Sequence, residues 1–299
     1  MDEPIVVFIT GCSSGLGRAA AEVLAKKGMR VYAGVRESIG RNANVAAKLR
    51  ELNSEGRFLR VVELDVSSDA SVQTAVRQAL EESGRIDVLV NNAGCAVVGP
   101  VEAFTAEQWK KLFDTNLFGA VRMNRAVLPS MRHRRKGLLI QISSVSGRGV
   151  VPGQGPYSAS KFAVGVLAET YRYELAPFGI DSILIEPFFY ATGIHGRSGG
   201  PADESCAAEY ASVADVGNRM LAFMQAALKG PNVGDPPELA ERIAELIHMP
   251  FGKRPLHTVL PVATQGMFQP LDSFMDQFQR GGMEMMGFKD LLEQRPHAN

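Results

Sequence analysis

The chain has 299 residues, of which 45% are hydrophobic, and its 32 lysines and arginines balance its 32 aspartates and glutamates. This length and apolar content suit one large α/β domain or two small ones, and a net charge of zero excludes overall attraction to nucleic acid or anionic lipid. Three widely separated cysteines and five histidines without an HxH or HExxH pattern predict neither a disulfide framework nor a metal site.

Short apolar runs alternate with helical segments along the first half of the chain. Runs rich in β-branched residues predict strands buried on both faces at 5–11, 30–36, 58–66 and 86–94. An alanine-rich helix is predicted over 15–28, and a second helix within 68–84. A longer helix is expected from about Thr105, as its N-cap, to Arg135, with a bend or break at Pro129.

The second half continues the alternation of strands and helices. Strands are predicted at 137–144, 180–187 and 257–263, and helices at 157–176 and 237–247. Strands that alternate with helices at this spacing form right-handed βαβ units, so we expect an α/β fold with a doubly wound parallel sheet of about seven strands.

We expect a single domain over residues 1–299, with the core in residues 1–187. Residues 188–236 are rich in Gly, Ala, Ser and Met and poor in strand signals. Such a long excursion predicts a substrate-binding lid above the sheet. Residues 237–299 would form a C-terminal helix, a strand and a tail. No signal peptide and no transmembrane segment is visible, which predicts a cytoplasmic protein.

The segment "TGCSSGLG" at 10–17 follows the first predicted strand and opens the first helix. Glycines 11, 15 and 17 would let the backbone approach a pyrophosphate, which the positive end of the helix would hold. Glycine turns also serve simply to pack a helix against a strand, but the position after the first strand favours a dinucleotide site. The spacing is GxxxGxG rather than the commoner GxGxxG.

Tyr157 and Lys161 are four residues apart at the start of a predicted helix, so they lie on one face. A nearby ammonium favours the phenolate, which would make the tyrosine usable as an acid or base near neutral pH. The alternative interpretation is a surface Tyr and Lys on an amphipathic helix, because YxxxK alone is a common pattern.

Five motifs in one order resemble the short-chain dehydrogenase/reductase family in its compact single-domain form. They are TGxxxGxG, "NNAG" at 91–94, Asn116, Ser144 thirteen residues before the tyrosine, and YxxxK at 157–161. The resemblance covers about residues 5–192 and implies a Rossmann-type fold. "VYAGVR", "AVLPSMRHRRKG" and "YSASKFAV" are most similar to the branch that holds 17β-hydroxysteroid and retinol dehydrogenases.

The resemblance implies a role for each of four catalytic residues. Tyr157 would donate a proton to a carbonyl oxygen or accept one from an alcohol. Lys161 would lower the tyrosine pKa and hydrogen-bond the nicotinamide ribose. Ser144 would hydrogen-bond the substrate oxygen, and Asn116 would hold a water molecule that links the lysine to solvent.

A larger set would bind the cofactor by the same resemblance. It comprises Gly11, Ser13, Ser14, Gly15, Leu16, Gly17, Arg36, Asp65, Val66, Asn92, Ala93, Gly94, Tyr157, Lys161, Pro187 and Thr192. The second strand ends in Val35 and Arg36 without an acid, and a guanidinium suits a 2′-phosphate, so NADP is favoured and NAD stays possible. The alternative is that Arg36 only stacks on adenine. Phe188 stands where family members usually have a glycine that leaves room for the nicotinamide.

The expected substrate is a bulky hydrophobic alcohol, or its ketone or aldehyde, of steroid or retinoid type. The residues predicted to contact it are Ser144, Val151, Gln154, Phe188 and Phe189. Alternatives are a reductase of smaller carbonyl or 3-oxoacyl substrates, and a non-catalytic NADP-binding sensor, which would typically lack the tyrosine or the lysine. An epimerase of nucleotide sugars would usually show GxxGxxG. The resemblance also implies a homodimer or homotetramer that packs through helices 105–131 and 157–176.

Overall fold

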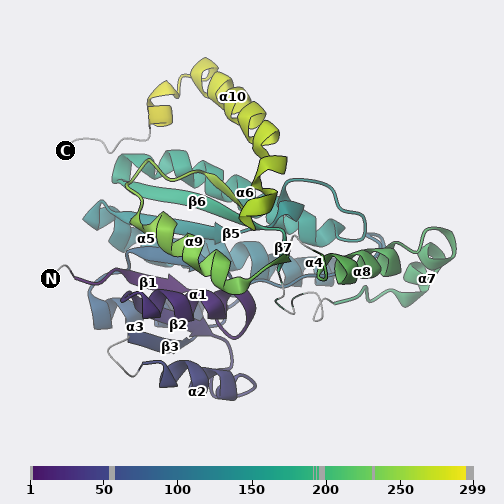
Figure 1. Ribbon diagram of the computed structural model, residues 1–299, viewed down its shortest axis with the longest axis horizontal. Coiled ribbons are helices and arrows are strands. Elements are labelled where there is room, and N and C mark those ends of the chain that lie inside the picture. The colour runs from purple at the N-terminus through teal and green to yellow at the C-terminus, as the bar shows by residue number, and fades with distance from the viewer. Residues whose placement is uncertain are drawn as a thin grey trace.

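A seven-stranded sheet runs through the computed structural model of the protein, which describes residues 3–53, 58–190, 192, 194, 199–230 and 233–293 (Figure 1). Its order is β3-β2-β1-β4-β5-β6-β9, and each neighbouring pair is parallel. The strands are β1 (Val6–Ile9), β2 (Arg30–Val35), β3 (Phe58–Glu63), β4 (Val88–Asn91), β5 (Gly137–Ile142), β6 (Ile180–Pro187) and β9 (His257–Leu260). The predicted doubly wound parallel sheet is confirmed.

Helices cover both faces of this sheet and create one apolar core on each side. α1 (Gly15–Lys26), α2 (Ala43–Glu51) and α9 (Pro236–His248) pack on one face. α3 (Asp69–Ser83), α5 (Gly119–Arg134) and α6 (Gly155–Glu174) pack on the other. The strands are mostly apolar and buried because parallel strands between two helical layers are covered on both faces.

The long predicted helix is divided, but not at Pro129. α4 (Ala106–Phe113) begins after Thr105, whose side chain and that of Gln108 form a capping box. A π-helical turn at Asp114–Phe118 then leads into α5, which runs through Pro129. The predicted break at Pro129 is therefore wrong, and the irregularity lies in the turn that carries Asn116. Single π-turns inside helices are frequent at functional sites.

Several helices were not predicted because their sequences bury few side chains. α2 buries only Ala46 and Leu49, and α7 (Glu204–Val213) has no buried residue. α8 (Val216–Ala227) buries two methionines, and α10 (Gln269–Met285) buries only Met283. The excursion also contains β7 (Phe189–Tyr190), which pairs with β8 (Val233–Gly234). Amphipathic periodicity is weak where so little apolar surface faces a core.

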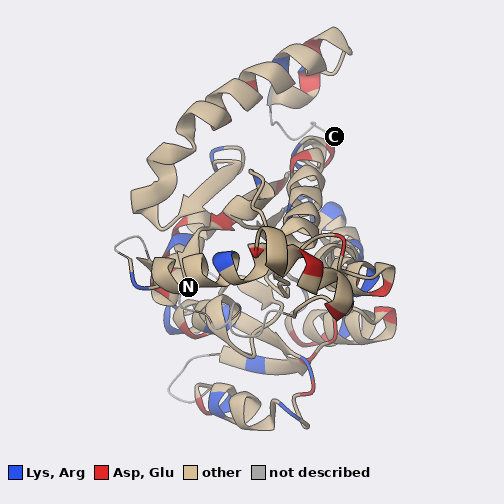
Figure 2. Cartoon of the chain, turned by 90° about the vertical axis from the view of Figure 1, so that its right-hand side faces the viewer, with Lys and Arg blue, Asp and Glu red and all other residues tan. Residues whose placement is uncertain are grey.

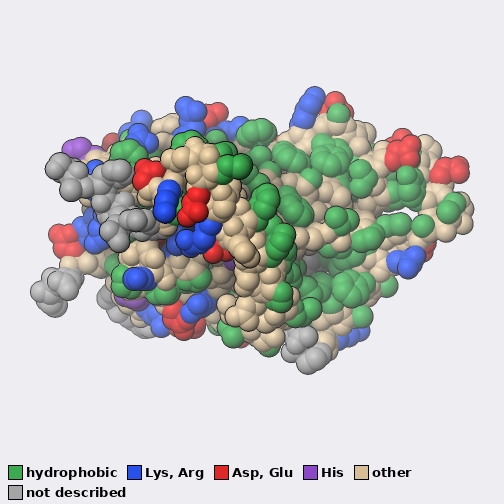
Figure 3. All heavy atoms as spheres, turned by 90° about the horizontal axis from the view of Figure 1, so that it is seen from above, with side chains coloured by type: hydrophobic (Ala, Val, Ile, Leu, Met, Phe, Trp, Pro, Cys, Tyr) green, Lys and Arg blue, Asp and Glu red, His purple; other side chains and the backbone are tan. Residues whose placement is uncertain are grey.

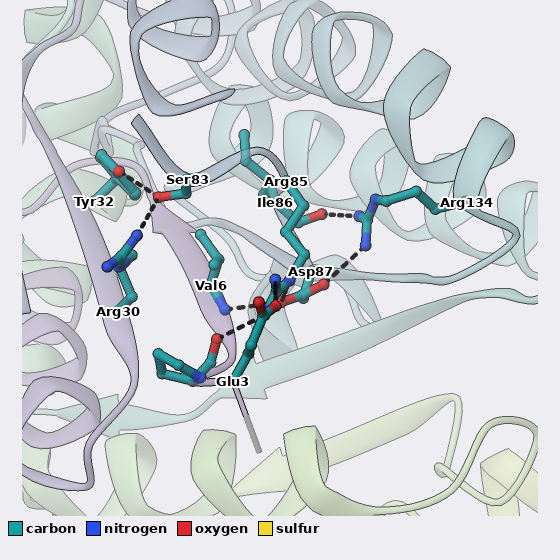
Figure 4. Close-up of polar contacts among 10 residues, drawn as sticks. Glu3, Val6, Arg30, Tyr32, Ser83, Arg85, Ile86, Asp87 and Arg134 are labelled. Atoms are coloured by element: carbon teal, nitrogen blue, oxygen red, sulfur yellow. Dashed lines mark hydrogen bonds and ion pairs between the residues drawn. The ribbon is translucent and has the colours of Figure 1, made fainter. Parts of the chain in front are cut away.

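Asp87 holds the amino-terminal edge of the sheet together (Figure 4). Its carboxylate accepts hydrogen bonds from the backbone N–H of Val6 at 2.9 Å, Arg85 at 3.1 Å and Arg134 at 2.9 Å. Arg134 belongs to α5, so this single side chain joins β1, β4 and α5. These hydrogen bonds stabilise the amino-terminal edge of the sheet. Parallel sheets bind ligands at the opposite edge, where the carboxyl ends of the strands lie.

Charged residues of both signs are interspersed on the side of the molecule that Figure 2 shows. Several form exposed pairs, such as Arg77 with Glu81 and Arg280 with Asp276. Within the described ranges, no helix is long and apolar enough to cross a membrane.

A buried ionic cluster lies between β6, β9 and α6. Arg148 donates a hydrogen bond to Glu186 at 2.9 Å, and the same carboxylate lies 3.2 Å from Nδ1 of His257. Nε2 of His257 is 3.5 Å from Glu169. Burial alone would lower the pKa of His257, but the two carboxylates outweigh it and raise the pKa to about 9.

His257→Gln should remove a stabilisation that depends on pH. The imidazole binds its proton more tightly in the folded state, so its contribution is complete below the ordinary pKa of about 6.5 and is lost as pH rises through about 9. The maximum difference in unfolding free energy should be on the order of 3 kcal/mol. Urea denaturation below pH 6.5 and above pH 9 measures it, with the exposed His248→Gln as control. An equal destabilisation at both pH values would contradict the assignment.

Candidate active site

The four predicted catalytic residues converge at the carboxyl end of the sheet. Asn116 lies in the π-turn, Ser144 is two residues beyond the end of β5, and Tyr157 and Lys161 belong to the first two turns of α6. All four are buried. They come from three separate elements, which is typical of sites at the carboxyl edge of parallel sheets.

The hydroxyl of Tyr157 lies close enough to Ser144 for that serine to influence its pKa. Burial raises the pKa of Tyr157 to about 12, and Ser144 opposes that rise. Ser144 in turn accepts a hydrogen bond from the backbone N–H of Ser146 at 3.1 Å. The phenol is therefore protonated at neutral pH and lies beside a fixed serine.

Lys161 lies below the tyrosine ring, with Nζ 5.9 Å from the ring centroid. Its ammonium donates a hydrogen bond to the carbonyl oxygen of Ile142 at 2.9 Å. Burial lowers the pKa of Lys161 to about 8. The predicted lowering of the tyrosine pKa by the lysine is not seen: burial raises the pKa of the phenol, and the opposing influence comes from Ser144.

Asn116 clamps the loop after β4 to the tyrosine helix. Its Oδ1 accepts from the backbone N–H of Cys95 at 2.9 Å, and its Nδ2 donates to the carbonyl oxygen of Cys95 at 3.0 Å and to Ser160 at 2.9 Å. A Cβ on Gly94 would stand 3.3 Å from Asn116 Oδ1 and 3.6 Å from Nζ of Lys161. Gly94 therefore lies between the amide of Asn116 and the ammonium of Lys161.

A small internal cavity adjoins Asn116. Its volume is about 10 Å³, which is room for about one water molecule. Two of the side chains in its wall, Asn91 and Gln141, have a buried carbonyl oxygen that accepts no hydrogen bond from the part of the chain that the structure describes. A polar cavity with unpaired acceptors of this kind suits bound water. Its other walls are Thr10, Val66, Ala93, Thr115, Asn116, Gly119, Ala120, Ile142 and Val164.

The glycine-rich loop and the "NNAG" segment form one unit. Thr10 Oγ1 accepts hydrogen bonds from the backbone N–H groups of Asn92 at 3.0 Å and Ala93 at 2.9 Å. Gly11 has φ of +72°, and a Cβ there would stand 2.8 Å from the Cα of Ala93. A Cβ on Gly17 would stand 2.3 Å from Asn92 Nδ2. Both positions therefore require glycine.

The first turn of α1 fits the pyrophosphate of a dinucleotide. It contains no acidic residue, and the preceding Ser13 and Ser14 are half-buried, as is Leu16. Gly15 has φ of +56°, and a Cβ there would stand 3.1 Å from the side chain of Thr192. Thr192 thus lies beside the glycine-rich loop, and a side chain at position 15 would press against it.

Arg36 and Asp65 lie near each other at the ends of β2 and β3, and Val66 beside them is buried. Burial would raise the pKa of Asp65, but hydrogen bonds from Ser67 and the charges of Arg36 and Arg122 lower it. The Arg36 side chain is 49% exposed and 3.9 Å from Glu37, which is also exposed. The arginine is therefore free to reorient toward a ligand.

Of the residues predicted to contact the substrate, Val151, Gln154 and Phe189 lie near helix α8 (Val216–Ala227). The ring of Phe188 packs edge-on against Phe189 at 4.7 Å, and Phe189 packs against Phe223 of α8 at 5.7 Å. Val151 and Phe189 also contact buried Met220 and Met224. Gln154 is buried and accepts a hydrogen bond from Ser146 at 3.1 Å. Pro187 ends β6 in register with Leu260.

Three supporting residues were not predicted as part of the site. They are Thr10, Ser146 and Ser160, which bond Asn92, Gln154 and Asn116 respectively. Thr10 stands within the quoted glycine motif, so its position was visible. The two serines have no local signal, because their partners are distant in the chain. Among the described residues, no group of three or more His, Cys, Asp or Glu is placed to hold a metal.

Comparison with known proteins gives matches over most of the chain. Residues 5–200 match the family described as short chain dehydrogenase. The chain is 40% identical over 194 residues to a 3-ketodihydrosphingosine reductase of Bacteroides thetaiotaomicron, which covers 64% of this chain and 66% of that protein. It is 41% identical over 197 residues to human retinol dehydrogenase 8, and the match covers 65% of this chain and 61% of that protein. The chain thus spans about two thirds or less of these relatives' length.

Solved structures match over nearly the whole chain. A short-chain dehydrogenase from Streptomyces avermitilis has a TM-score of 0.75 and 30% identity, covering 96% of this chain and 98% of that one. One from Burkholderia phymatum in complex with NAD has a TM-score of 0.73 and 27% identity, covering 90% and 94%. One from Sphingobium yanoikuyae in complex with NADPH has a TM-score of 0.70 and 28% identity, covering 92% and 95%.

Proposed function

The chain belongs to the short-chain dehydrogenase family, and from that premise we propose that it interconverts a hydrophobic alcohol and its ketone or aldehyde with NADP(H). The family makes it an oxidoreductase that acts on CH–OH groups with a nicotinamide cofactor. The observation that carries the proposal is the buried pair of Tyr157 and Ser144, which stands beside Lys161 and close to the glycine-rich loop.

Tyr157 and Ser144 together handle the substrate oxygen. The nicotinamide supplies or accepts the hydride when it is bound. Ser144 donates a hydrogen bond to the carbonyl oxygen and stabilises the negative charge that grows there. Tyr157 donates its proton to that oxygen during reduction and takes one back during oxidation. Its raised pKa supports the first role, because the phenol carries a proton throughout the physiological range.

Lys161 and Asn116 return the proton to the tyrosine. The ammonium of Lys161 would hydrogen-bond the nicotinamide ribose and favour the phenolate as the proton leaves. Asn116 holds the loop after β4 and borders the small polar cavity. We propose that a water molecule in this cavity, held by Asn116 and the unpaired oxygen of Asn91, links the lysine to solvent protons.

An apolar substrate is favoured by the wall around the candidate site. Val151 and Phe189 pack against a cluster that includes Met220 and Met224 of α8, and Phe188 packs on Phe189, so the surroundings here are apolar. Methionine and aromatic side chains pack adaptably around apolar ligands. The names of two relatives specify a ketodihydrosphingosine and retinol. We propose that α7 and α8, within residues 188–236, form a lid over this substrate.

The rival interpretations predict different substrates or no turnover. A reductase of smaller carbonyl or 3-oxoacyl substrates would act on those in preference to bulky apolar ketones. A sensor would bind the cofactor without turnover, and the intact pair of Tyr157 and Lys161 argues against it. NADPH consumption with a panel that contains each class separates them. Turnover confined to small carbonyls, or absent throughout, would overturn the proposed substrate class.

NADP is the cofactor that the end of β2 favours. Arg36 is exposed and lies near Asp65, in the region that would receive the adenosine. A guanidinium there can pair with a 2′-phosphate. Glu37 is the competing feature, because a carboxylate accepts hydrogen bonds from a ribose hydroxyl and repels a phosphate. Its backbone N–H is fixed by Glu63 at 2.7 Å, while its side chain points to Arg36 and Arg41.

Arg36→Ala should shift the preference from NADP toward NAD. A charge-assisted hydrogen bond to the 2′-phosphate contributes about 1.5–3 kcal/mol, or roughly ten- to a hundredfold in kcat/KM. The measurement is kcat/KM with each cofactor. Arg41→Ala is the matched control, since Arg41 also faces Glu37. A variant that introduces an acidic residue to favour NAD should carry it at position 36 rather than 35, because Val35 is fully buried in the core. An unchanged ratio in Arg36→Ala would contradict this assignment.

A homodimer or homotetramer in the cytoplasm completes the proposal. The three free cysteines are compatible with a reducing compartment. The outer surface near α5 and α6 exposes Phe118, Phe162 and Val166, and these apolar side chains support the predicted packing of the two helices against their symmetry mates.

A further inference from the structure

Helix α10 presents its apolar side chains to solvent. It follows β9 and stands away from the body of the domain (Figure 1). Of its residues only Met283 is buried. Its apolar residues recur at spacings of three and four, which places them on one face. This apolar face of α10 comprises Leu271, Phe274, Met275, Phe278 and Met285.

The apolar face of α10 is large enough to form a protein–protein interface. Phe274 is 64% exposed, Phe278 67% and Met285 85%. With the adjoining Met286 and Phe288, and at about 150–250 Å² for each large side chain, it offers on the order of 700 Å² of apolar surface. That is close to the roughly 800 Å² that each partner contributes to an interface of standard size. Hydrophobic side chains gather along this side of the molecule (Figure 3).

The contacts that hold α10 in place show that its apolar face is not buried against its own domain. Asp272, at the start of the helix, pairs with the buried Arg148. Asp272 and Gln279 are half-buried, while the apolar residues point outward. Turning the apolar face inward would expose Met283 and leave Arg148 without this partner. The helix is therefore held with its apolar face outward.

The composition of α10 favours another protein helix over a lipid surface. The helix carries Asp272, Asp276 and Glu284 against a single cation, Arg280, which disfavours an anionic membrane. Gly281 and Gly282 are poor helix formers, and a Cβ on either would have no atom of the described residues within 4 Å. The fold of one chain therefore does not explain two consecutive glycines. Small residues in a helix allow a second helix backbone to approach closely.

We propose that the apolar face of α10 packs against the same face of a second copy of this chain, with the two helices crossing at Gly281 and Gly282. A two-fold contact of this kind uses the same patch on both subunits. It is separate from the predicted packing of α5 and α6, and it does not depend on the proposed function.

The test measures mass in solution by light scattering at micromolar concentration. The double variant Phe274→Glu, Phe278→Glu should halve the mass of the wild type. Ser273→Glu, on the polar side of the same helix, is the matched control and should leave the mass unchanged. Phe278→Cys should form an intermolecular disulfide under mild oxidation, whereas Ser273→Cys should not.

A second variant separates a helix pair from lipid binding. Gly281→Leu with Gly282→Leu adds apolar surface without a clash inside the chain. It should weaken self-association at least tenfold, while a lipid-binding helix would bind vesicles of zwitterionic phospholipid more tightly. A monomeric wild type, an unchanged mass in the Phe274→Glu, Phe278→Glu variant, or no disulfide in Phe278→Cys would overturn the proposal, whether or not the vesicles are bound.

Discussion

Tyr157→Phe should lower kcat for carbonyl reduction by about 10²–10⁴-fold. The substitution removes the proton donor but keeps the ring, which is buried beside Ser144. Because the packing is retained, the affinity for NADPH should be nearly unchanged. Steady-state kinetics with an apolar ketone, together with fluorescence titration of NADPH, measure both effects.

Tyr171→Phe provides the matched control for this variant. Tyr171 lies on the same helix, is half-buried and contacts the core on the α5 side of the sheet. It should retain normal turnover. If Tyr157→Phe turned over at a rate within a few-fold of the wild type, the assignment of the tyrosine as acid and base would be wrong.

Lys161→Met should reduce kcat/KM by a similar factor of about 10²–10⁴, since it removes the charge that favours the phenolate. It should also weaken NADPH binding, because the ammonium would hydrogen-bond the ribose. The unbranched methionine fills the space of the lysine stem, which is buried between α6 and β5. The exposed Lys110→Met on α4 is the control.

The role of Lys161 also predicts how kcat/KM changes with pH. The pKa of Lys161 is lowered to about 8, so the ammonium is charged below that pH and loses its proton above it. The kcat/KM of the wild type for reduction should therefore fall as pH rises through about 8, and Lys161→Met should lack that step. A pH profile of the same shape in both proteins would rule out the lysine as the titrating group.

The sheet could be predicted because its strands are buried on both faces. Val6–Ile9 is apolar over its whole length, and Ile180–Pro187 is buried over its whole length although it carries three polar or charged side chains. The order of the strands then follows from the βαβ pattern. Helices α7 and α10 could not be predicted in the same way, because they bury almost nothing against the domain.

The residues of the candidate site could be predicted from the sequence, but their burial, their pKa values and the local backbone conformation could not. Spacing placed Tyr157 and Lys161 on one face of a helix, and the motifs added Ser144 and Asn116. Sequence could not show that burial would raise the pKa of the tyrosine, since burial depends on elements far apart in the chain. Nor could it show that Asn116 lies in a π-turn, because local sequence predicts the regular helix on either side.

Transfer of deuterium from NADPH to an apolar ketone tests the central claim most directly. NADPH labelled at the reactive carbon of the nicotinamide, on either face in separate samples, is incubated with the protein and a bulky hydrophobic ketone. Mass spectrometry of the alcohol should show one deuterium on the carbinol carbon with one label and none with the other, and Tyr157→Phe should form product about 10²–10⁴-fold more slowly. Absence of labelled alcohol with both labels would contradict the account.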